Sequence, residues 1–124
     1  PQTGPAAPWG SVARGSSVLF NLVNEGGGIQ GRKIKYFYRD DMYNPAQTKA
    51  VVKELVEKQG IFAFVGGVSA AGGLAVKDYL KENKVIWVGP ATSVKEYVFP
   101  VNPYLFSVYP LYEDEASILT QYVV

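Results

Sequence analysis

The sequence contains neither cysteine nor histidine, and these two absences exclude several kinds of chemistry. Without them the chain has no Ser-His-Asp or Cys-His nucleophile system, no imidazole general base and no common type of zinc site. A carboxylate-only enzyme remains conceivable, but it would need a suitable acidic pair. The lack of cysteine leaves the redox compartment open, because an exported protein can also be free of disulfides.

Excess charge and long apolar runs are also missing. The formal net charge is +1, which gives no electrostatic reason to expect binding to nucleic acid or to an anionic membrane surface. No stretch of 18 apolar residues occurs, so no membrane-spanning helix is expected. With 124 residues, 48% hydrophobic and 19% charged, the composition is that of one globular domain.

Short apolar runs mark the expected strands. Continuous runs of this kind are typical of strands that are buried on both faces of a parallel sheet. The strands are expected at residues 61–65, 85–89 and, more weakly, 104–108, with an aromatic-rich strand at 33–39.

Helices are expected between these strands. Asn44 and Pro45 form a capping signal, apolar residues follow with helical spacing, and Gly60 ends the pattern. Three further helices are expected at residues 11–25, 70–82 and from about Glu113 onward.

The order of these elements predicts an α/β fold. Alternating strands and helices favour a doubly wound, mostly parallel sheet with helices on both faces. The chain opens with a loop and a helix that no strand precedes. We therefore expect that the first strand of the sheet is missing from this chain. If that strand is the central one, we expect either a strand-exchanged homo-oligomer or a strand supplied by a separate piece of polypeptide.

The stretch VGGVSAAGG, residues 65–73, is the most distinctive candidate site. Glycines before a helix let backbone N–H groups approach an anion. The stretch has no lysine and fits neither the Walker nor the dinucleotide pattern, so a carboxylate is a better candidate than a nucleotide phosphate. Ligands of parallel sheets bind beyond the carboxyl ends of the strands. The small and hydroxyl-bearing residues expected there are Ser69, Ala70, Ala91, Thr92 and Ser93, although each alone could simply cap a helix.

The two tryptophans call for different interpretations. Trp9 lies in a loop between Pro8 and Gly10, where it could cover an apolar ligand group or pack against the sheet edge. Trp87 lies in the middle of an apolar run and is expected in the core.

Asp40 and Asp41 raise the alternatives of a metal site or a phosphoryl-accepting receiver domain. A receiver would need a third aspartate after the next strand, where Gly66 and Gly67 stand, and a lysine after the following one, where Gly89 begins a neutral loop. The sequence meets neither requirement, so it does not fit a receiver domain. The two aspartates are therefore expected to cap the turn before the helix at Asn44.

Five segments resemble a known family. They read, in order, GPAAPWG, NEGGGIQGRKI, RDDMYNPAQTKAVVKELVEK, IFAFVGGVSAAG and VIWVGPATS. Together they are similar to the amino-terminal lobe of the periplasmic Leu/Ile/Val-binding protein family, the type I solute-binding proteins of ABC importers. The resemblance implies that residues 1–124 form this ligand-binding lobe and that the carboxyl-terminal lobe is absent from the chain.

The resemblance also implies a ligand site between two lobes. Trp9 would pack over the ligand, Ser69 and Ala70 would contact its carboxylate, and Ala91 with Thr92 or Ser93 would line the same wall. Tyr112 stands where amino-acid binders tend to place a partner for the substrate ammonium. Its hydroxyl cannot neutralise that charge, so an aromatic or aliphatic acid or an amide fits as well as a branched-chain or other hydrophobic amino acid.

The function implied is that of an extracytoplasmic solute-binding component of an ABC importer. No catalytic residue, metal or cofactor is expected. The expected partners are a small-molecule ligand and an ABC permease, without nucleic acid. The implied location is periplasmic or extracellular, with a lipid anchor at the cell surface as one option. A sensor ectodomain of the same fold is the main alternative, and a doubly wound enzyme domain is less favoured.

Overall fold

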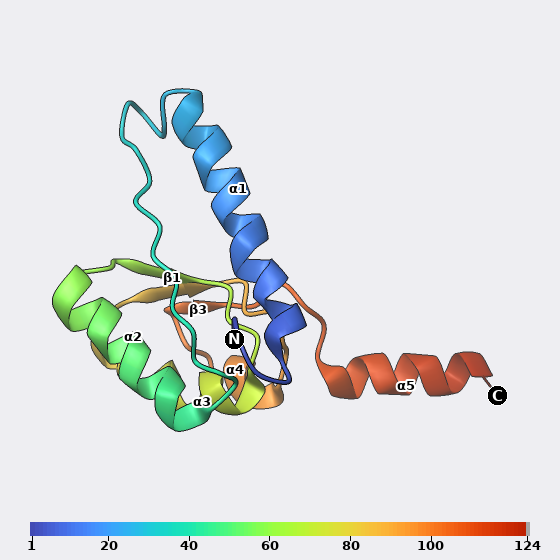
Figure 1. The fold of residues 1–124 in the computed structure, drawn as a ribbon. Helices are drawn as coiled ribbons and strands as arrows, with labels where there is room; N and C mark the ends of the chain where they lie inside the picture. The colour runs from blue at the N-terminus through green and yellow to red at the C-terminus, as the bar shows by residue number, and fades with distance from the viewer. Residues whose placement is uncertain (124) are drawn as a thin grey trace.

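The computed structural model describes residues 1–123 as a small α/β unit (Figure 1). Its elements, in chain order, are η1 (Ala7–Gly10), α1 (Ser11–Glu25), α2 (Pro45–Gln59), β1 (Ala63–Val65), α3 (Ala70–Glu82), β2 (Ile86–Val88), α4 (Lys95–Val98), β3 (Leu105–Phe106) and α5 (Tyr112–Val123). Strands and helices alternate from α2 to α5, as the sequence predicts. The strands are shorter than the apolar runs that mark them.

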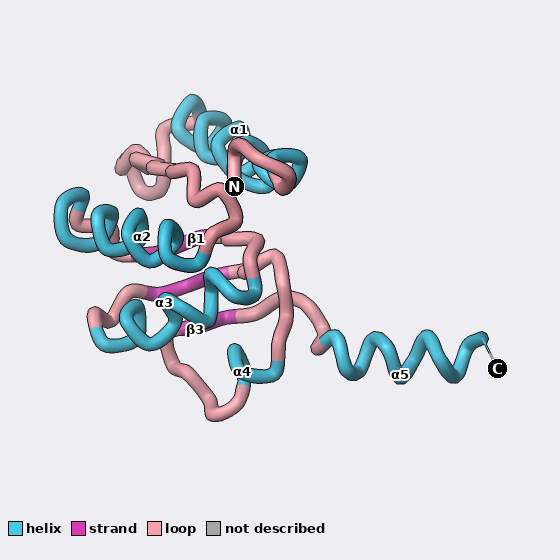
Figure 2. Tube along the Cα trace, turned by 60° about the horizontal axis from the view of Figure 1, so that its bottom comes forward, coloured by secondary structure: helices cyan, strands magenta, loops and turns pink. Residues whose placement is uncertain are grey.

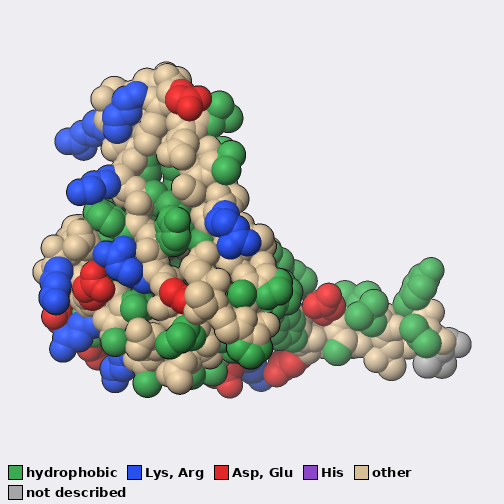
Figure 3. All heavy atoms as spheres, in the orientation of Figure 1, with side chains coloured by type: hydrophobic (Ala, Val, Ile, Leu, Met, Phe, Trp, Pro, Cys, Tyr) green, Lys and Arg blue, Asp and Glu red, His purple; other side chains and the backbone are tan. Residues whose placement is uncertain are grey.

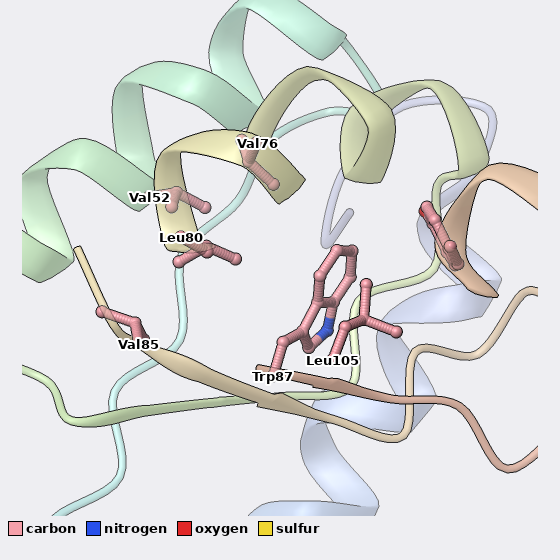
Figure 4. Close-up of a cluster of buried hydrophobic side chains, with 7 residues drawn as sticks. Val52, Val76, Leu80, Val85, Trp87 and Leu105 are labelled. Atoms are coloured by element: carbon pink, nitrogen blue, oxygen red, sulfur yellow. The ribbon is translucent and has the colours of Figure 1, made fainter. Parts of the chain in front are cut away.

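The sheet is parallel and has the order β1-β2-β3. Phe64 lies beside Trp87, and Trp87 lies beside Leu105. Helices α2, α3 and α4 cover one face, and α1 lies on the other side of the sheet (Figures 1 and 4). The arrangement confirms a doubly wound sheet with helices on both faces.

The expected strand at residues 33–39 is wrong. The segment joins no sheet, and the only bridge near it is the isolated pair Ile29 and Arg32. A strand exists only where a neighbour completes its hydrogen bonds, and β1 pairs with β2 alone. Within residues 1–123 nothing pairs with this segment, although its aromatic and branched residues favour a strand.

The core lies between the sheet and the three helices that cover it (Figure 4). Its buried members are Val52, Val76, Leu80, Val85, Trp87, Tyr97 and Leu105. Trp87 is 2% exposed, which confirms its expected core position. Its indole nitrogen donates a 2.6 Å hydrogen bond to the carbonyl of Gly66, so the core tryptophan also holds the end of β1.

The turn before α2 has the predicted caps. The Asn44 side chain accepts hydrogen bonds from the amides of Ala46 and Gln47. Asp40 accepts from the amides of Gln2 and Met42 at 2.6 and 3.0 Å, which ties the amino-terminal loop to this turn. The hydrogen bonds from Gln2, Thr3 and Met42 lower the pKa of Asp40, so this carboxylate has a structural role.

Asp41 has a similar structural role. It accepts a hydrogen bond from the Tyr43 amide at 3.1 Å and one from the Thr48 hydroxyl at 2.7 Å. The expectation that the two aspartates cap this turn is confirmed.

The last helix stands apart from the rest. Helix α5 projects away from the sheet, and its apolar side chains Ile118, Leu119 and Tyr122 are exposed (Figures 2 and 3). Among residues 1–123, none of the helices combines the length and the apolar character that crossing a bilayer requires.

Candidate functional site

Two loops meet at the carboxyl edge of the sheet, as the parallel strand order requires. The first follows β1 and leads into α3, and the second follows β2. The amide of Ala91 in the second loop donates a 2.8 Å hydrogen bond to the carbonyl of Gly67 in the first. This bond holds the candidate residues of the two loops on one surface.

The amino-terminal end of α3 has two free backbone donors. Ser69 is the N-cap, and its hydroxyl accepts a 2.9 Å hydrogen bond from the Gly72 amide. The amides of Ala70 and Ala71 have no hydrogen-bond partner within residues 1–123. Unpaired amides and the helix dipole together give this end a positive potential. The end of α3 is therefore suited to a carboxylate.

Glycines shape this loop in two different ways. Gly67 has a φ of +92°, a conformation that residues with a side chain rarely adopt. Gly73 has a packing role, because a methyl group there would overlap the hydroxyl of Tyr97 and come within 2.7 Å of the Trp87 ring. The first glycine turns the chain into α3, and the second lets α3 lie close to the core.

Tyr97, in α4, also positions α3, although the sequence analysis did not single it out. Its hydroxyl lies 3.4 Å from the carbonyl of Ser69 and 3.3 Å from that of Ala70, as the donor to both. Burial is the main cause that raises the pKa of Tyr97, with smaller effects from Tyr112 and Tyr43. The hydroxyl is therefore a neutral donor at physiological pH. A lone aromatic residue in a four-residue helix has no periodicity that could have revealed this role.

The second wall of the site is formed by the loop after β2 and the start of α5. The Tyr112 hydroxyl donates a 2.9 Å hydrogen bond to the Thr92 hydroxyl, and the Tyr112 amide lies 3.4 Å from the Ser93 carbonyl. Thr92 is 5% exposed, so it is almost completely covered in this structure. The Ser93 side chain is fully buried and donates to the carbonyl of Tyr109 at 3.2 Å. Its hydroxyl fixes the loop and faces the interior.

Trp9 lies apart from the second wall, on the side of α1. It belongs to η1, is 58% exposed and borders a cavity of about 140 Å³ together with Val65, Gly67 and Val68. The indole is thus next to the loop that leads into α3 and remains open to solvent. The structure thus brings Ala91 to the loop that leads into Ser69 and Ala70. It joins Thr92 to Tyr112 by a hydrogen bond. Trp9 lies beside the start of the loop that follows β1.

The chemistry available at this edge is hydrogen bonding by amides and hydroxyls. Within the described residues, no group of three acidic side chains is arranged to hold a metal ion. The arrangement can bind a small anion at the α3 end and contact an apolar group at Trp9. It offers no evident nucleophile with a neighbouring base.

The sequence matches a family described as "Periplasmic binding protein" over residues 1–124. Among curated proteins it is similar to the Leu/Ile/Val-binding protein homolog 3 of Brucella melitensis, with 34% identity over 94 residues. This match covers 75% of the present chain and 25% of the relative. The chain therefore spans about a quarter of the length of the curated relatives that it matches.

Solved structures share the same fold. A substrate-binding periplasmic protein from Ralstonia solanacearum superposes with a TM-score of 0.89 and 27% identity, over 99% of this chain and 35% of that one. A branched-chain amino acid ABC transporter protein from Thermus thermophilus with bound valine superposes with a TM-score of 0.83 and 26% sequence identity. This match covers 98% of the present chain and 32% of that one. The matched curated relatives are named as binding proteins.

Proposed function

The chain belongs to the periplasmic binding protein family, and from this premise we propose that residues 1–124 form one ligand-binding lobe of a solute-binding protein of an ABC importer. The second lobe would come from polypeptide outside this chain, because the relatives are about four times as long. The permease partner and a periplasmic or cell-surface location, with or without a lipid anchor, belong to the same proposal.

The observation that carries the proposal is the amino-terminal end of α3. Two unpaired amides, of Ala70 and Ala71, lie at the carboxyl edge of a parallel sheet, where ligands of such folds bind. A charge-assisted hydrogen bond from an amide to a carboxylate contributes roughly 1.5 to 3 kcal/mol. We therefore propose a small carboxylate-bearing ligand with an apolar side group.

Each candidate residue has a part in this proposal. The Ser69 cap and the Ala91 loop hold the carboxylate cradle, Thr92 and Tyr112 line the opposite wall, and Trp9 covers the apolar group. Ser93 has an indirect role, because its hydrogen bond to the Tyr109 carbonyl fixes the loop that follows β2. The relatives named for leucine, isoleucine and valine support a branched aliphatic group, whereas Tyr112 offers a ligand ammonium no negative charge.

Three related compounds test which chemical groups of the ligand the site recognises. L-Leucine, 4-methylpentanoate and L-leucinamide share one side chain, and the second lacks the ammonium while the third lacks the carboxylate. In calorimetry on the full-length protein, we expect the first two to bind and the amide to bind at least about tenfold more weakly, a loss of about 1.4 kcal/mol. Equal binding of the amide would contradict the carboxylate cradle.

Trp9→Ala tests the apolar side of the site. We expect the full-length variant to lose more than about tenfold in affinity for L-leucine, because an aromatic wall is removed from a ligand that is otherwise enclosed. Trp87→Phe is the control, since this core change should lower stability and leave the affinity nearly unchanged. Residues 1–124 alone should bind only in the millimolar range, about −4 kcal/mol, because half of the walls are absent. If Trp9→Ala binds like the parent, Trp9 is a structural turn residue.

A further inference from the structure

The turn before α2 holds two successive residues in a left-handed backbone conformation. Met42 has a φ of 49° and Tyr43 a φ of 60°, a region that residues other than glycine rarely adopt. Within residues 1–123, the other non-glycine residues with a positive φ are Gln30 and Lys84, and each of these is isolated. Strained backbone of this kind persists only where the surrounding contacts hold it.

Two carboxylates hold the strained turn. Asp40 accepts a hydrogen bond from the Met42 amide at 3.0 Å, and Asp41 accepts one from the Tyr43 amide at 3.1 Å. The Asp41 carbonyl also accepts a 2.9 Å hydrogen bond from the Asn44 amide. The backbone of Tyr43 is thus fixed, although its side chain is 46% exposed. Its ring therefore leaves the backbone in a set direction without being packed into the core.

This turn lies against the start of α3. The Thr48 hydroxyl donates a 2.7 Å hydrogen bond to Asp41 and would lie 2.7 Å from a methyl group placed on Gly72. A small cavity of about 40 Å³ is bordered by Asp41 and Thr48 on one side and by Val68 and Ser69 on the other. The turn that carries Tyr43 is therefore a direct neighbour of the loop that ends in the two free amides.

The Tyr43 phenol also lies near the buried hydroxyl of Tyr97, which is 3.3 Å from the Ala70 carbonyl. Burial is the main cause that raises the pKa of Tyr97, and the Tyr112 and Tyr43 phenols add smaller effects. Because such charge effects weaken with distance, both phenols must lie close to the start of α3. They come from different elements, and Figure 1 shows α2 and α5 on opposite sides of the molecule.

The hydroxyl of Tyr43 is free to bind a ligand. Within residues 1–123 it forms no hydrogen bond, and only the amide of this residue is engaged. The hydroxyl of Tyr112 is already used by Thr92, and that of Tyr97 by the first carbonyls of α3. A carboxylate has about four acceptor positions, so two amides leave room for a further donor. Among these three phenols, Tyr43 is the one with an unused donor.

We propose that Tyr43 is a further ligand-binding residue, whose hydroxyl donates a hydrogen bond to the ligand carboxylate beside the amides of Ala70 and Ala71. This inference rests on the proposed function, because it concerns the same carboxylate site. It adds a contact from the turn before α2, outside the loops that follow β1 and β2. The strained turn then has a functional reason, since it holds the phenol at the edge of the site.

Tyr43→Phe removes only the hydroxyl, and Tyr38→Phe is its matched control. Tyr38 is 50% exposed, and its hydroxyl likewise forms no hydrogen bond within residues 1–123. In calorimetry on the full-length protein, Tyr43→Phe should weaken the binding of L-leucine and of 4-methylpentanoate by about tenfold or more, because a hydrogen bond to a charged group is lost. Tyr38→Phe should leave both affinities unchanged. Urea denaturation should give both variants the stability of the parent.

L-Leucinamide identifies the ligand group that the hydroxyl contacts. Tyr43→Phe should change the affinity for this compound by less than about threefold, because a hydrogen bond to a neutral group contributes less than one to a carboxylate. A tenfold loss for L-leucine that 4-methylpentanoate does not share would place the hydroxyl at the ammonium and overturn the proposal. Equal losses for all three compounds, together with lower stability, would show a purely structural role and also overturn it.

The same measurements separate this inference from the proposed function. If the parent prefers the two carboxylates over the amide and Tyr43→Phe binds them as the parent does, the inference is wrong and the proposed function stands. An equal loss in Tyr38→Phe would also overturn the inference, since the effect would then not be specific to Tyr43. If the parent binds neither carboxylate, the proposed function fails and this inference fails with it.

Discussion

Gly73 allows the closest approach in the core, and replacing it with alanine gives a sharp test of how α3 is held. A methyl group at this position would overlap the Tyr97 hydroxyl and lie 2.7 Å from Cη2 of Trp87. Both neighbours are almost completely buried and cannot move aside without disturbing the core. Overpacking of this kind costs typically about 1 to 3 kcal/mol, and more where the contact is severe.

Alanine would also bring a gain, because it is favoured over glycine in a helix by about 1 kcal/mol. Gly15 provides this gain without the clash, since it lies in α1 and a methyl group there meets nothing within 4 Å. We therefore expect Gly15→Ala to raise the free energy of unfolding by up to about 1 kcal/mol. Gly73→Ala should lower it by about 1 to 2 kcal/mol or more, because overpacking exceeds the gain.

Urea denaturation followed by circular dichroism measures both variants, and Tyr97→Phe completes the test. That change removes the hydroxyl that the new methyl would strike, although the ring carbon that bore it and Trp87 still crowd the site. The double variant should therefore be less destabilised than the sum of the two single ones. If Gly73→Ala stabilises the protein as Gly15→Ala does, α3 does not approach the core as closely as we describe.

Two further predictions concern the turn before α2. Burial opposes the ionisation of Asp41, but hydrogen bonds, among them those from the Thr48 hydroxyl and the Tyr43 amide, lower its pKa. The stabilisation from Asp41 should therefore be present above about pH 4 and be lost as the pH falls through the lowered folded-state pKa. Asp41→Asn should flatten this acid limb of a stability–pH curve, and an unchanged limb would refute the assignment. Asn44→Ala removes the cap of Ala46 and Gln47 and should cost about 1 kcal/mol in urea denaturation, whereas no loss would show that solvent caps the helix equally well.

The helices were predictable because their signals are local. Asn44, Pro45 and Gly60 bracket α2 by capping chemistry that operates within a few residues, and the structure begins and ends the helix there. The apolar runs likewise located β1, β2 and β3. The short elements η1 and α4 were not predicted, because four residues carry no periodicity from which a helix could be inferred.

The failed strand at 33–39 shows what local sequence cannot provide. Its residues favour extended backbone, and the contacts of Lys35 with Phe37 and of Tyr36 with Tyr38, each at a spacing of two residues, show that they adopt it. Strand pairing also requires a neighbouring strand to hydrogen-bond with, and the composition of a segment does not reveal whether one is present. The same limit applies to the site. The sequence indicated that Ser69 and Ser93 belong to loops at one edge, but whether each hydroxyl faces a ligand or a helix depends on tertiary contacts.

The two unpaired amides at the start of α3 have a consequence for how the site responds to change. A main-chain N–H does not lose its proton at physiological pH, and no side-chain substitution other than proline deletes it. An anion held by Ala70 and Ala71 is therefore attached to a part of the molecule that is insensitive to acidity and largely protected from mutation. Divergence within such a lineage would concentrate on the exposed rim, at Trp9 and Tyr112, where a single altered side chain can change which molecules are accepted while the anchor persists.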